Sequence, residues 1–250
     1  MQLTTLVPTV LKLRPLQSSD LAAGEKWSLD SGETLDCIGY QAERNKHWKI
    51  VLAKPRSDRS TWFAFQDHVA LELDPSDRPE TVKLNVPFKS QLDNEFNPRG
   101  SCNVTSIAMC LAMLGVQDKP GDGLEQLEDE LYDYMERKGL SRHSPEDLAR
   151  VVRDYGKKDD FTVWGTFERC KDHLAAGNPC VIHGYFTSFG HIIALVGYDD
   201  TGFIVHDPYG EWFSSGYRTD LSGEFLHYSY DLIQRTCIPD GQFWVHYISS

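Results

Sequence analysis

Apolar residues recur at helical spacing through the middle of the chain. Each apolar stripe ends at a glycine, and the third begins at Ser144-Pro145, with serine as the N-cap and proline in the first turn. Apolar residues at intervals of three and four mark one face of a helix. The spacing predicts four helices, at about 101–114, 124–139, 145–155 and 167–176.

Short β-rich runs flank this helical part on both sides. Within the first 72 residues, Gly, Pro, Ser and Asp turns separate them, and short strands at this density predict a small β-barrel. After the helices, two apolar runs are joined by Asp199-Asp200-Thr201-Gly202, a hairpin signal. The predicted strands are 9–13, 34–38, 47–52 and 61–65 in the first part and 180–185, 191–198 and 203–206 in the second.

Helices followed by antiparallel strands indicate an α+β architecture for the larger part of the chain. Residues 73–80 are polar and contain two prolines, which is typical of a domain boundary. The pattern predicts a β-barrel domain at 1–72, a linker at 73–83 and an α+β domain at 84–250.

Charge and composition exclude several function classes. The 250 residues carry a net charge of −12, which argues against nucleic-acid binding, because phosphate contacts need clustered Lys and Arg. No apolar run is long enough to span a membrane, and no secretory signal peptide is visible at the N-terminus. We expect a cytoplasmic protein, or one that is released by a non-classical route.

The six cysteines are widely spaced and include no C-x-x-C pair, which disfavours a structural zinc site. Cys102 differs from the others because it stands where the first predicted helix begins. Free N–H groups and the helix dipole favour a thiolate there, so its position makes Cys102 the candidate nucleophile. The alternative is a structural cysteine at a helix start.

A histidine and an aspartate are placed to assist this cysteine. His191 opens one strand of the hairpin, and Asp207 directly follows the returning strand. An antiparallel return brings the two together, so the carboxylate would orient the imidazole as a general base. The alternative is that His191 only packs in the core and that Asp207-Pro208 only forms a turn. His183, His191 and His206 lack metal-ligand spacing, so we expect no metal and no cofactor.

Both parts of the chain resemble known families. Leu11-Lys12-Leu13-Arg14-Pro15, Lys46-His47-Trp48-Lys49-Ile50 and Thr61-Trp62-Phe63-Ala64 resemble the signatures of bacterial SH3-like domains. The larger part resembles papain-like cysteine peptidases, most closely the bacteriocin-leader-processing (double-glycine) branch. The matching stretches are Val86-Pro87-Phe88-Lys89-Ser90-Gln91, Gly100-Ser101-Cys102-Asn103-Val104-Thr105-Ser106-Ile107-Ala108-Met109, Gly177-Asn178-Pro179, Gly190-His191-Ile192, Gly197-Tyr198-Asp199 and Asp207-Pro208-Tyr209-Gly210.

The resemblance implies a papain-like fold with helices packed on an antiparallel sheet. It also implies Cys102, His191 and Asp207 as catalytic residues and Gln91 as the oxyanion residue. The usual Cys-Gly-Pro is Cys102-Asn103-Val104 here, and no transporter region follows, so leader processing coupled to export is not expected. Trp212 either lines a substrate cleft or packs in the core.

The implied function is hydrolysis of a peptide or amide bond through a thioester. Because SH3-like modules accompany such domains in bacterial cell-wall hydrolases, the resemblance favours a peptidoglycan substrate and a lysin or autolysin role. The alternatives are cleavage of protein substrates, acyl transfer to an amine, and an inactive binding protein that uses its SH3-like module. The sequence does not indicate the cleaved bond or the oligomeric state.

Overall fold

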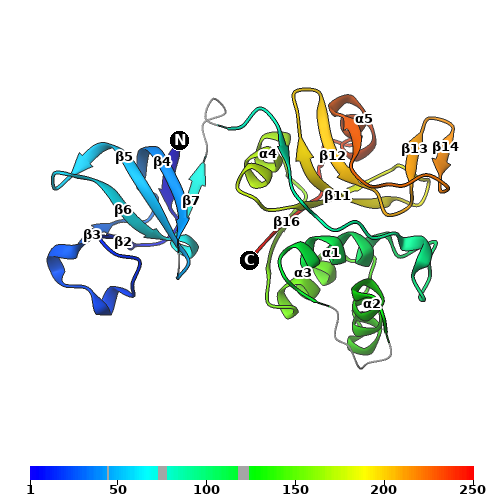
Figure 1. Ribbon diagram of the computed structural model, residues 1–250, viewed down its shortest axis with the longest axis horizontal. Helices are drawn as coiled ribbons and strands as arrows, with labels where there is room; N and C mark the ends of the chain where they lie inside the picture. Colours follow the sequence, from blue (N-terminus) through cyan, green and yellow to red (C-terminus); the bar gives the residue numbers. More distant parts are fainter. Residues whose placement is uncertain (44, 73–77, 118–123) are drawn as a thin grey trace. The chain divides into compact units, whose positions relative to one another are not determined.

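The computed structural model describes residues 1–43, 45–72, 78–117 and 124–250 (Figure 1). The chain divides into two compact units, Met1–Arg78 and Pro79–Ser250. Part of the predicted linker, residues 73–77, lies outside the described residues.

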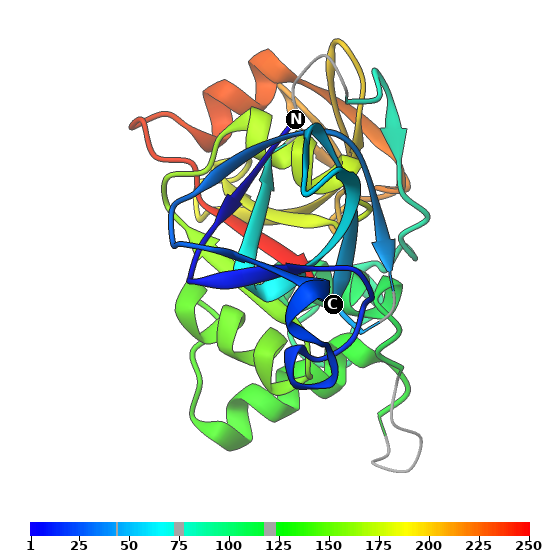
Figure 2. The same cartoon turned by 90° about the vertical axis from the view of Figure 1, so that its left-hand side faces the viewer.

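The first unit is a seven-stranded antiparallel sheet, drawn in blue to cyan in Figures 1 and 2. Its order is β3-β2-β6-β5-β4-β1-β7, and its apolar core includes Leu11, Ile50 and Trp62. The strands are β1 (Gln2–Thr5), β2 (Thr9–Lys12), β3 (Lys26–Leu29), β4 (Thr34–Glu43), β5 (His47–Arg56), β6 (Arg59–Phe65) and β7 (Val69–Glu72).

The predicted barrel is not observed. Within the described residues, no pairing joins the terminal strands β3 and β7, so the sheet does not close. These end strands have only four residues each, and β2 pairs with β6 only through Lys12 and Phe63. The four predicted strands correspond to β2, β4, β5 and β6, whereas β1, β3 and β7 were not predicted. Each has four residues, too few to establish a periodicity, and the prediction of the equally short β2 rested on the β-rich composition of residues 9–13.

The second unit is built on an antiparallel sheet with the order β15-β12-β11-β10-β16-β9, and β8 pairs with β11. The strand order brings the chain end, β16, between β10 and β9. A separate hairpin consists of β13 and β14. The strands are β8 (Val82–Lys83), β9 (Lys158–Thr162), β10 (Cys180–Gly184), β11 (His191–Tyr198), β12 (Gly202–His206), β13 (Glu211–Phe213), β14 (Gly216–Arg218), β15 (Leu226–Ser229) and β16 (Val245–Ser249).

Helices cover both faces of this sheet (Figure 1). Alternate residues of β11 point to opposite faces: Ala194 packs with the first three helices, and Leu195 packs with the last two. The result is an α+β architecture in three layers. The helices are α1 (Cys102–Met113), α2 (Leu127–Lys138) and α3 (Pro145–Asp154) on one face and α4 (Phe167–Ala175) and α5 (Tyr230–Cys237) on the other.

The predicted bounds of the first four helices agree closely with those of α1, α2, α3 and α4. Ser144 caps α3 by accepting the Asp147 N–H, and Gly139 ends α2 in the left-handed conformation. The stretch 118–123, just before the second predicted helix, lies outside the described residues. In the described ranges, no helix is long and apolar enough to cross a membrane.

Candidate active site

Cys102 is the first residue of α1, and its side chain is half-buried. The first turn of α1 contains no acidic residue, so nothing there neutralises the positive end of the helix dipole. The other five cysteines are buried. Burial raises the pKa of Cys37 to about 11 and that of Cys237 to about 12. Cys102 is therefore the cysteine best placed to react as a thiolate.

His191 and Asp207 meet at one edge of the sheet, as the hairpin predicts. β11 and β12 are paired, and the His191 Nε2 lies 2.7 Å from the Asp207 Oδ1. The other ring nitrogen, Nδ1, is left for Cys102, which also acts to raise the pKa of His191. The imidazole thus interacts with both the buried carboxylate and the cysteine.

The Asp207 carboxylate is fully buried and receives three further hydrogen bonds. Oδ2 accepts from the hydroxyls of Tyr217 (2.8 Å) and Tyr228 (3.0 Å), and Oδ1 accepts from the Tyr209 N–H (3.0 Å). Burial and the Asp207 charge raise the pKa of both tyrosines, which keeps them as donors. No local pattern predicted these tyrosines, because they reach Asp207 from later strands and turns.

A glycine permits this arrangement. The Asp207 N–H donates to the Gly223 carbonyl at 2.9 Å, and a Cβ at position 223 would lie 1.8 Å from the Asp207 carbonyl oxygen. Any side chain at position 223 would therefore displace the segment that carries the carboxylate.

The charge of Asp207 decides the protonation of His191. Burial by itself lowers the pKa of His191, but the charges of Asp207 and Cys102 and the hydrogen bonds to both outweigh burial and raise the pKa to about 10. At neutral pH the ring is therefore an imidazolium. A thiolate beside an imidazolium is the reactive form of a cysteine nucleophile.

Gln91 forms hydrogen bonds with the segment before Cys102 and with the segment after Asp207. It is buried in a short 3₁₀ helix (Gln91–Asp93), its Nε2 donates to the Pro98 carbonyl (3.0 Å), and its main-chain N–H donates to the Pro208 carbonyl (2.9 Å). Nε2 carries a second hydrogen. That hydrogen and the Cys102 N–H are the donors available for an oxyanion.

The loop before Cys102 is braced by residues that the sequence did not single out. The buried Asn94 amide donates to Ser101 Oγ (2.8 Å) and to Thr105 Oγ1 (3.0 Å). Arg142 donates to the Gly100 carbonyl (3.1 Å), and Asn103 Nδ2 donates to the Arg142 carbonyl (2.7 Å). These contacts join segments up to 42 residues apart, which is why no local motif reveals them.

A cavity of about 480 Å³ lies beside Cys102. Its lining includes Gln91, Cys102 and His191, together with the exposed aromatic residues Tyr185 and Phe189. The cavity thus combines polar groups beside a cysteine with aromatic rings at its margin, features that ligand-binding sites share.

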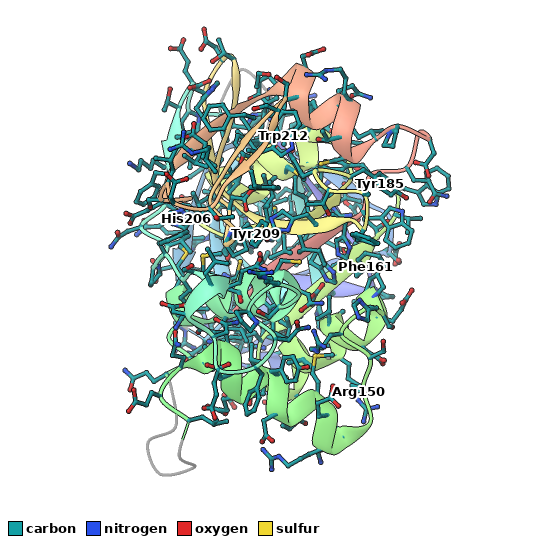
Figure 3. All side chains as sticks on the ribbon, turned by 90° about the vertical axis from the view of Figure 1, so that its right-hand side faces the viewer. Arg150, Phe161, Tyr185, His206, Tyr209 and Trp212 are labelled. Carbon is teal, nitrogen blue, oxygen red and sulfur yellow. The ribbon has the colours of Figure 1, made fainter. Side chains whose placement is uncertain are left out.

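Trp212 and His206 lie outside the lining of this cavity. Trp212 packs with Phe186 and donates its indole N–H to the Phe186 carbonyl at 2.9 Å. His206 is buried between the Val86 carbonyl and the Phe225 N–H. In Figure 3, Trp212, a residue of β13, lies farther from the green helices α1, α2 and α3 than Tyr209 does. A substrate contact for Trp212 stays a prediction, and this packing matches its alternative role in the core.

The three histidines considered for a metal do not converge on one point. His191 contacts Asp207, His206 contacts Val86, and His183 lies 3.0 Å from His246. In the part of the chain that the structure describes, no group of three or more His, Cys, Asp or Glu residues is arranged to hold a metal ion.

A known peptidase family matches most of the second unit. The model of the "Peptidase_C39 like family" matches residues 83–238. A structure of a C39-like peptidase from Bacillus anthracis aligns with 18% identity and a TM-score of 0.46, covering 67% of this chain and 98% of that one. A double glycine motif protease from an AMS/PCAT transporter, in complex with its leader peptide, aligns with 17% identity and a TM-score of 0.41, covering 68% and 95%. A comparison with curated proteins finds no match.

Proposed function

The chain belongs to the Peptidase_C39-like family of cysteine peptidases, and from that premise we propose that Cys102, His191 and Asp207 catalyse hydrolysis of a peptide bond. The observation that carries the proposal is the hydrogen bond between Asp207 and His191, together with the presence of His191 and Cys102 in the lining of one cavity.

In the proposed reaction, the Cys102 thiolate attacks the carbonyl carbon of the scissile amide. The carbonyl oxygen becomes an oxyanion, which accepts hydrogen bonds from Gln91 Nε2 and the Cys102 N–H. The His191 imidazolium gives its proton to the leaving amine, and the carbonyl reforms as a thioester. His191, now neutral, takes a proton from water as the water attacks the thioester, and the acid and the cysteine are released.

Asp207 acts through the imidazole in this scheme. It holds Nε2, directs Nδ1 to the sulfur, and stabilises the positive charge on the ring. The hydrogen bonds from Tyr217 and Tyr228 restrain the carboxylate, so that its position does not depend on a bound substrate.

The test is cleavage of a peptide library by the purified protein, read by mass spectrometry. We expect cleavage that Cys102→Ala abolishes and that Cys37→Ala, in the first unit, leaves unchanged. Cleavage that survives Cys102→Ala would exclude Cys102 as the nucleophile. If neither peptides nor peptidoglycan are cleaved and Cys102 does not react with thiol reagents, the chain is an inactive binding protein.

For the substrate class, we propose cell-wall peptides, with the first unit acting as a binding module. Support comes from the SH3-like signatures at Leu11–Pro15, Lys46–Ile50 and Thr61–Ala64 and from the compactness of the first unit. Incubation with purified peptidoglycan tests this proposal. Soluble stem-peptide fragments that depend on Cys102 are expected, whereas cleavage of protein substrates alone would contradict a cell-wall role.

A further inference from the structure

The first turn of α2 carries three acidic residues, and all of them are buried. Glu128, Asp129 and Glu130 have exposed fractions of 0%, 3% and 4%. The helix dipole favours carboxylates at this end of a helix, but it does not require them to be buried. Burial of a carboxylate costs free energy unless a partner compensates for the lost water. Glu130 accepts a hydrogen bond from the Tyr155 hydroxyl (2.7 Å), so the partners of the other two show what else this turn contacts.

Asp129 fixes the loop that follows Gln91. Its Oδ2 accepts the Glu95 N–H and its Oδ1 accepts the Phe96 N–H, both at 3.1 Å. Because two successive N–H groups bind the two oxygens of one carboxylate, the contact fixes the orientation of the main chain as well as its position. Two residues further on, the Pro98 carbonyl accepts a hydrogen bond from Gln91 Nε2 (3.0 Å). Asp129 thus holds the segment that orients the Gln91 amide.

This loop needs support because one of its residues has a strained backbone. Asn97, between Phe96 and Pro98, has a φ of 49°, in the left-handed region. The turn is also crowded, since a Cβ at Gly100 would lie 2.6 Å from the Asn97 Nδ2. Such conformations persist only where the surrounding contacts enforce them. The two hydrogen bonds to Asp129 supply contacts of this kind directly before the turn.

Glu128 holds the chain on the other side of Gln91. Residues 84–90 form neither helix nor strand, so no regular hydrogen-bond pattern fixes them. Lys89 reaches from this segment to the start of α2, where its Nζ lies 2.6 Å from the Glu128 Oε2. The two side chains are 18% and 0% exposed, so water and salt screen this ion pair only weakly.

A third side chain at the start of α2 contacts the same segment. Gln126, the N-cap residue, donates from Nε2 to the Asp93 carbonyl at 3.1 Å, and Asp93 belongs to the same 3₁₀ helix as Gln91. Gln126, Glu128 and Asp129 do not belong to the lining of the cavity, whereas Gln91 does. The start of α2 therefore contacts the chain before, within and after the short helix of Gln91, and its effect on a bound substrate passes through Gln91.

We propose that Glu128 and Asp129 are positioning residues that hold the Gln91 amide where the oxyanion forms. This inference rests on the proposed function and concerns the oxyanion donor of the same site. A donor stabilises the transition state only if it already points to the place where the charge develops, so a displaced donor loses most of its effect. A displacement of about 1 Å in such a group can lower the rate by about a hundredfold.

Two small reagents that react with Cys102 separate this role from all others. With p-nitrophenyl acetate, the thiolate attacks the carbonyl carbon, an oxyanion forms, and p-nitrophenolate leaves from the acetylated cysteine. With iodoacetamide, the thiolate displaces iodide from a saturated carbon, and no oxyanion forms. The ratio of the acylation rate to the alkylation rate therefore reports the oxyanion donors, because the reactivity of the thiolate enters both rates. Mass spectrometry of the peptide that contains Cys102 gives each rate.

Two variants and one matched control test the positioning role. Asp129→Asn turns an amide N–H toward a main-chain N–H, which should displace the loop and lower the ratio by about tenfold. The double variant Lys89→Met, Glu128→Gln removes the ion pair without leaving a lone buried charge, and it should also lower the ratio by about tenfold. The control is Asp133→Asn on the same helix, where the side chain is 36% exposed, and the ratio should stay at the wild-type value.

The effect must also pass through Gln91. Gln91→Ala removes the donor itself, so the ratio should fall by at least about tenfold. Addition of Asp129→Asn to Gln91→Ala should then change the ratio no further, because two residues that act through one group are not additive. The alkylation rate should stay within about twofold of the wild-type rate in every variant, since His191 and Cys102 are unchanged.

The inference is overturned if Asp129→Asn and the double variant keep the wild-type ratio while Gln91→Ala lowers it, and the peptidase proposal then stands. A further tenfold loss on addition of Asp129→Asn to Gln91→Ala would also overturn it, as would an unchanged ratio in Gln91→Ala. If p-nitrophenyl acetate does not acylate Cys102, the peptidase proposal itself fails. A cooperative unfolding transition shows that each variant is folded, and if Asp129→Asn does not fold, the double variant decides.

Discussion

The second unit contains two networks in which a buried carboxylate contacts an imidazole, and one histidine of each network lines the same cavity. Asp207 contacts His191 directly, and the pKa of His191 rises to about 10. Asp159 contacts His246, which stands between it and His183, and the pKa of His183 falls. In the first network the charged ring meets the cysteine itself. In the second, the additional ring of His246 separates the carboxylate from His183.

The comparison teaches that a buried carboxylate does not by itself create a catalytic histidine. What matters is the number of rings between the carboxylate and the cavity, and the number of donors on the carboxylate. Asp207 accepts four hydrogen bonds, whereas Asp159 Oδ1 accepts none within the described residues. Making the same substitution in both networks is the direct way to separate their roles.

The largest effect is expected for Asp207→Asn. An amide cannot stabilise the imidazolium or select its tautomer, so kcat should fall by about 10⁴-fold with little change in KM. His191→Ala should abolish turnover, and the double variant should be scarcely worse than His191→Ala alone. Steady-state kinetics on one peptide substrate measures these effects. If the losses in kcat from the two substitutions multiplied in the double variant, Asp207 would not act through His191.

The second-largest effect is expected for the difference in labelling rate between Cys102 and the other cysteines. At pH 7.5 a thiol with a pKa of about 11, such as Cys37, is roughly one part in three thousand thiolate. Iodoacetamide should therefore label Cys102 at least about a hundredfold faster than any other cysteine in the folded protein. Peptide mapping over time gives the rates. Equal or faster labelling of Cys37, Cys170 or Cys237 would remove the argument for Cys102.

The pH dependence follows from the raised pKa of His191. Cleavage needs the imidazolium proton, so activity should decline as the pH passes about 10, and Asp207→Asn should move that decline to lower pH. The raised pKa of His191 also means that protonation of His191 stabilises the folded state. This stabilisation is complete below about pH 6.5, the pKa in the unfolded chain, and is lost as the pH rises to about 10. Urea unfolding at pH 6 and at pH 10.5 measures this. Between these two values the free energy of unfolding should fall more for the wild type than for His191→Ala.

Asp159→Asn should have a smaller and different effect. The Asp159 carboxylate contacts His246, not His191 or Cys102. Cleavage of neutral peptides should change by less than about threefold, because His191 and Cys102 keep their partners. A loss as large as that of Asp207→Asn would show that the two networks are not separate.

Removal of the first unit should have the smallest effect on small substrates. Both networks lie within Pro79–Ser250, which has its own apolar cores, so a fragment of residues 79–250 should fold and cleave a soluble peptide at nearly the full rate. Activity on peptidoglycan should decrease if the first unit is a binding module. A folded fragment without any activity would show that the first unit shapes the active site.

The sequence by itself predicted the elements that carry Cys102, His191 and Asp207. Caps, terminal glycines and the hairpin signal at Asp199-Asp200-Thr201-Gly202 are local, because their hydrogen bonds join residues close in the chain. The pairing of His191 with Asp207 was predictable for the same reason, since a hairpin returns within a few residues. The fourth predicted helix also agrees closely with α4.

Only the tertiary structure decided the surroundings of these residues. Tyr217 and Tyr228 reach Asp207 from separate strands, and His183 meets His246 because β16 is inserted beside β10. The open sheet of the first unit likewise depends on which edge strands pair, and four-residue strands carry no signal of their partners. Local patterns report local hydrogen bonds, whereas contacts between distant segments depend on how the layers pack.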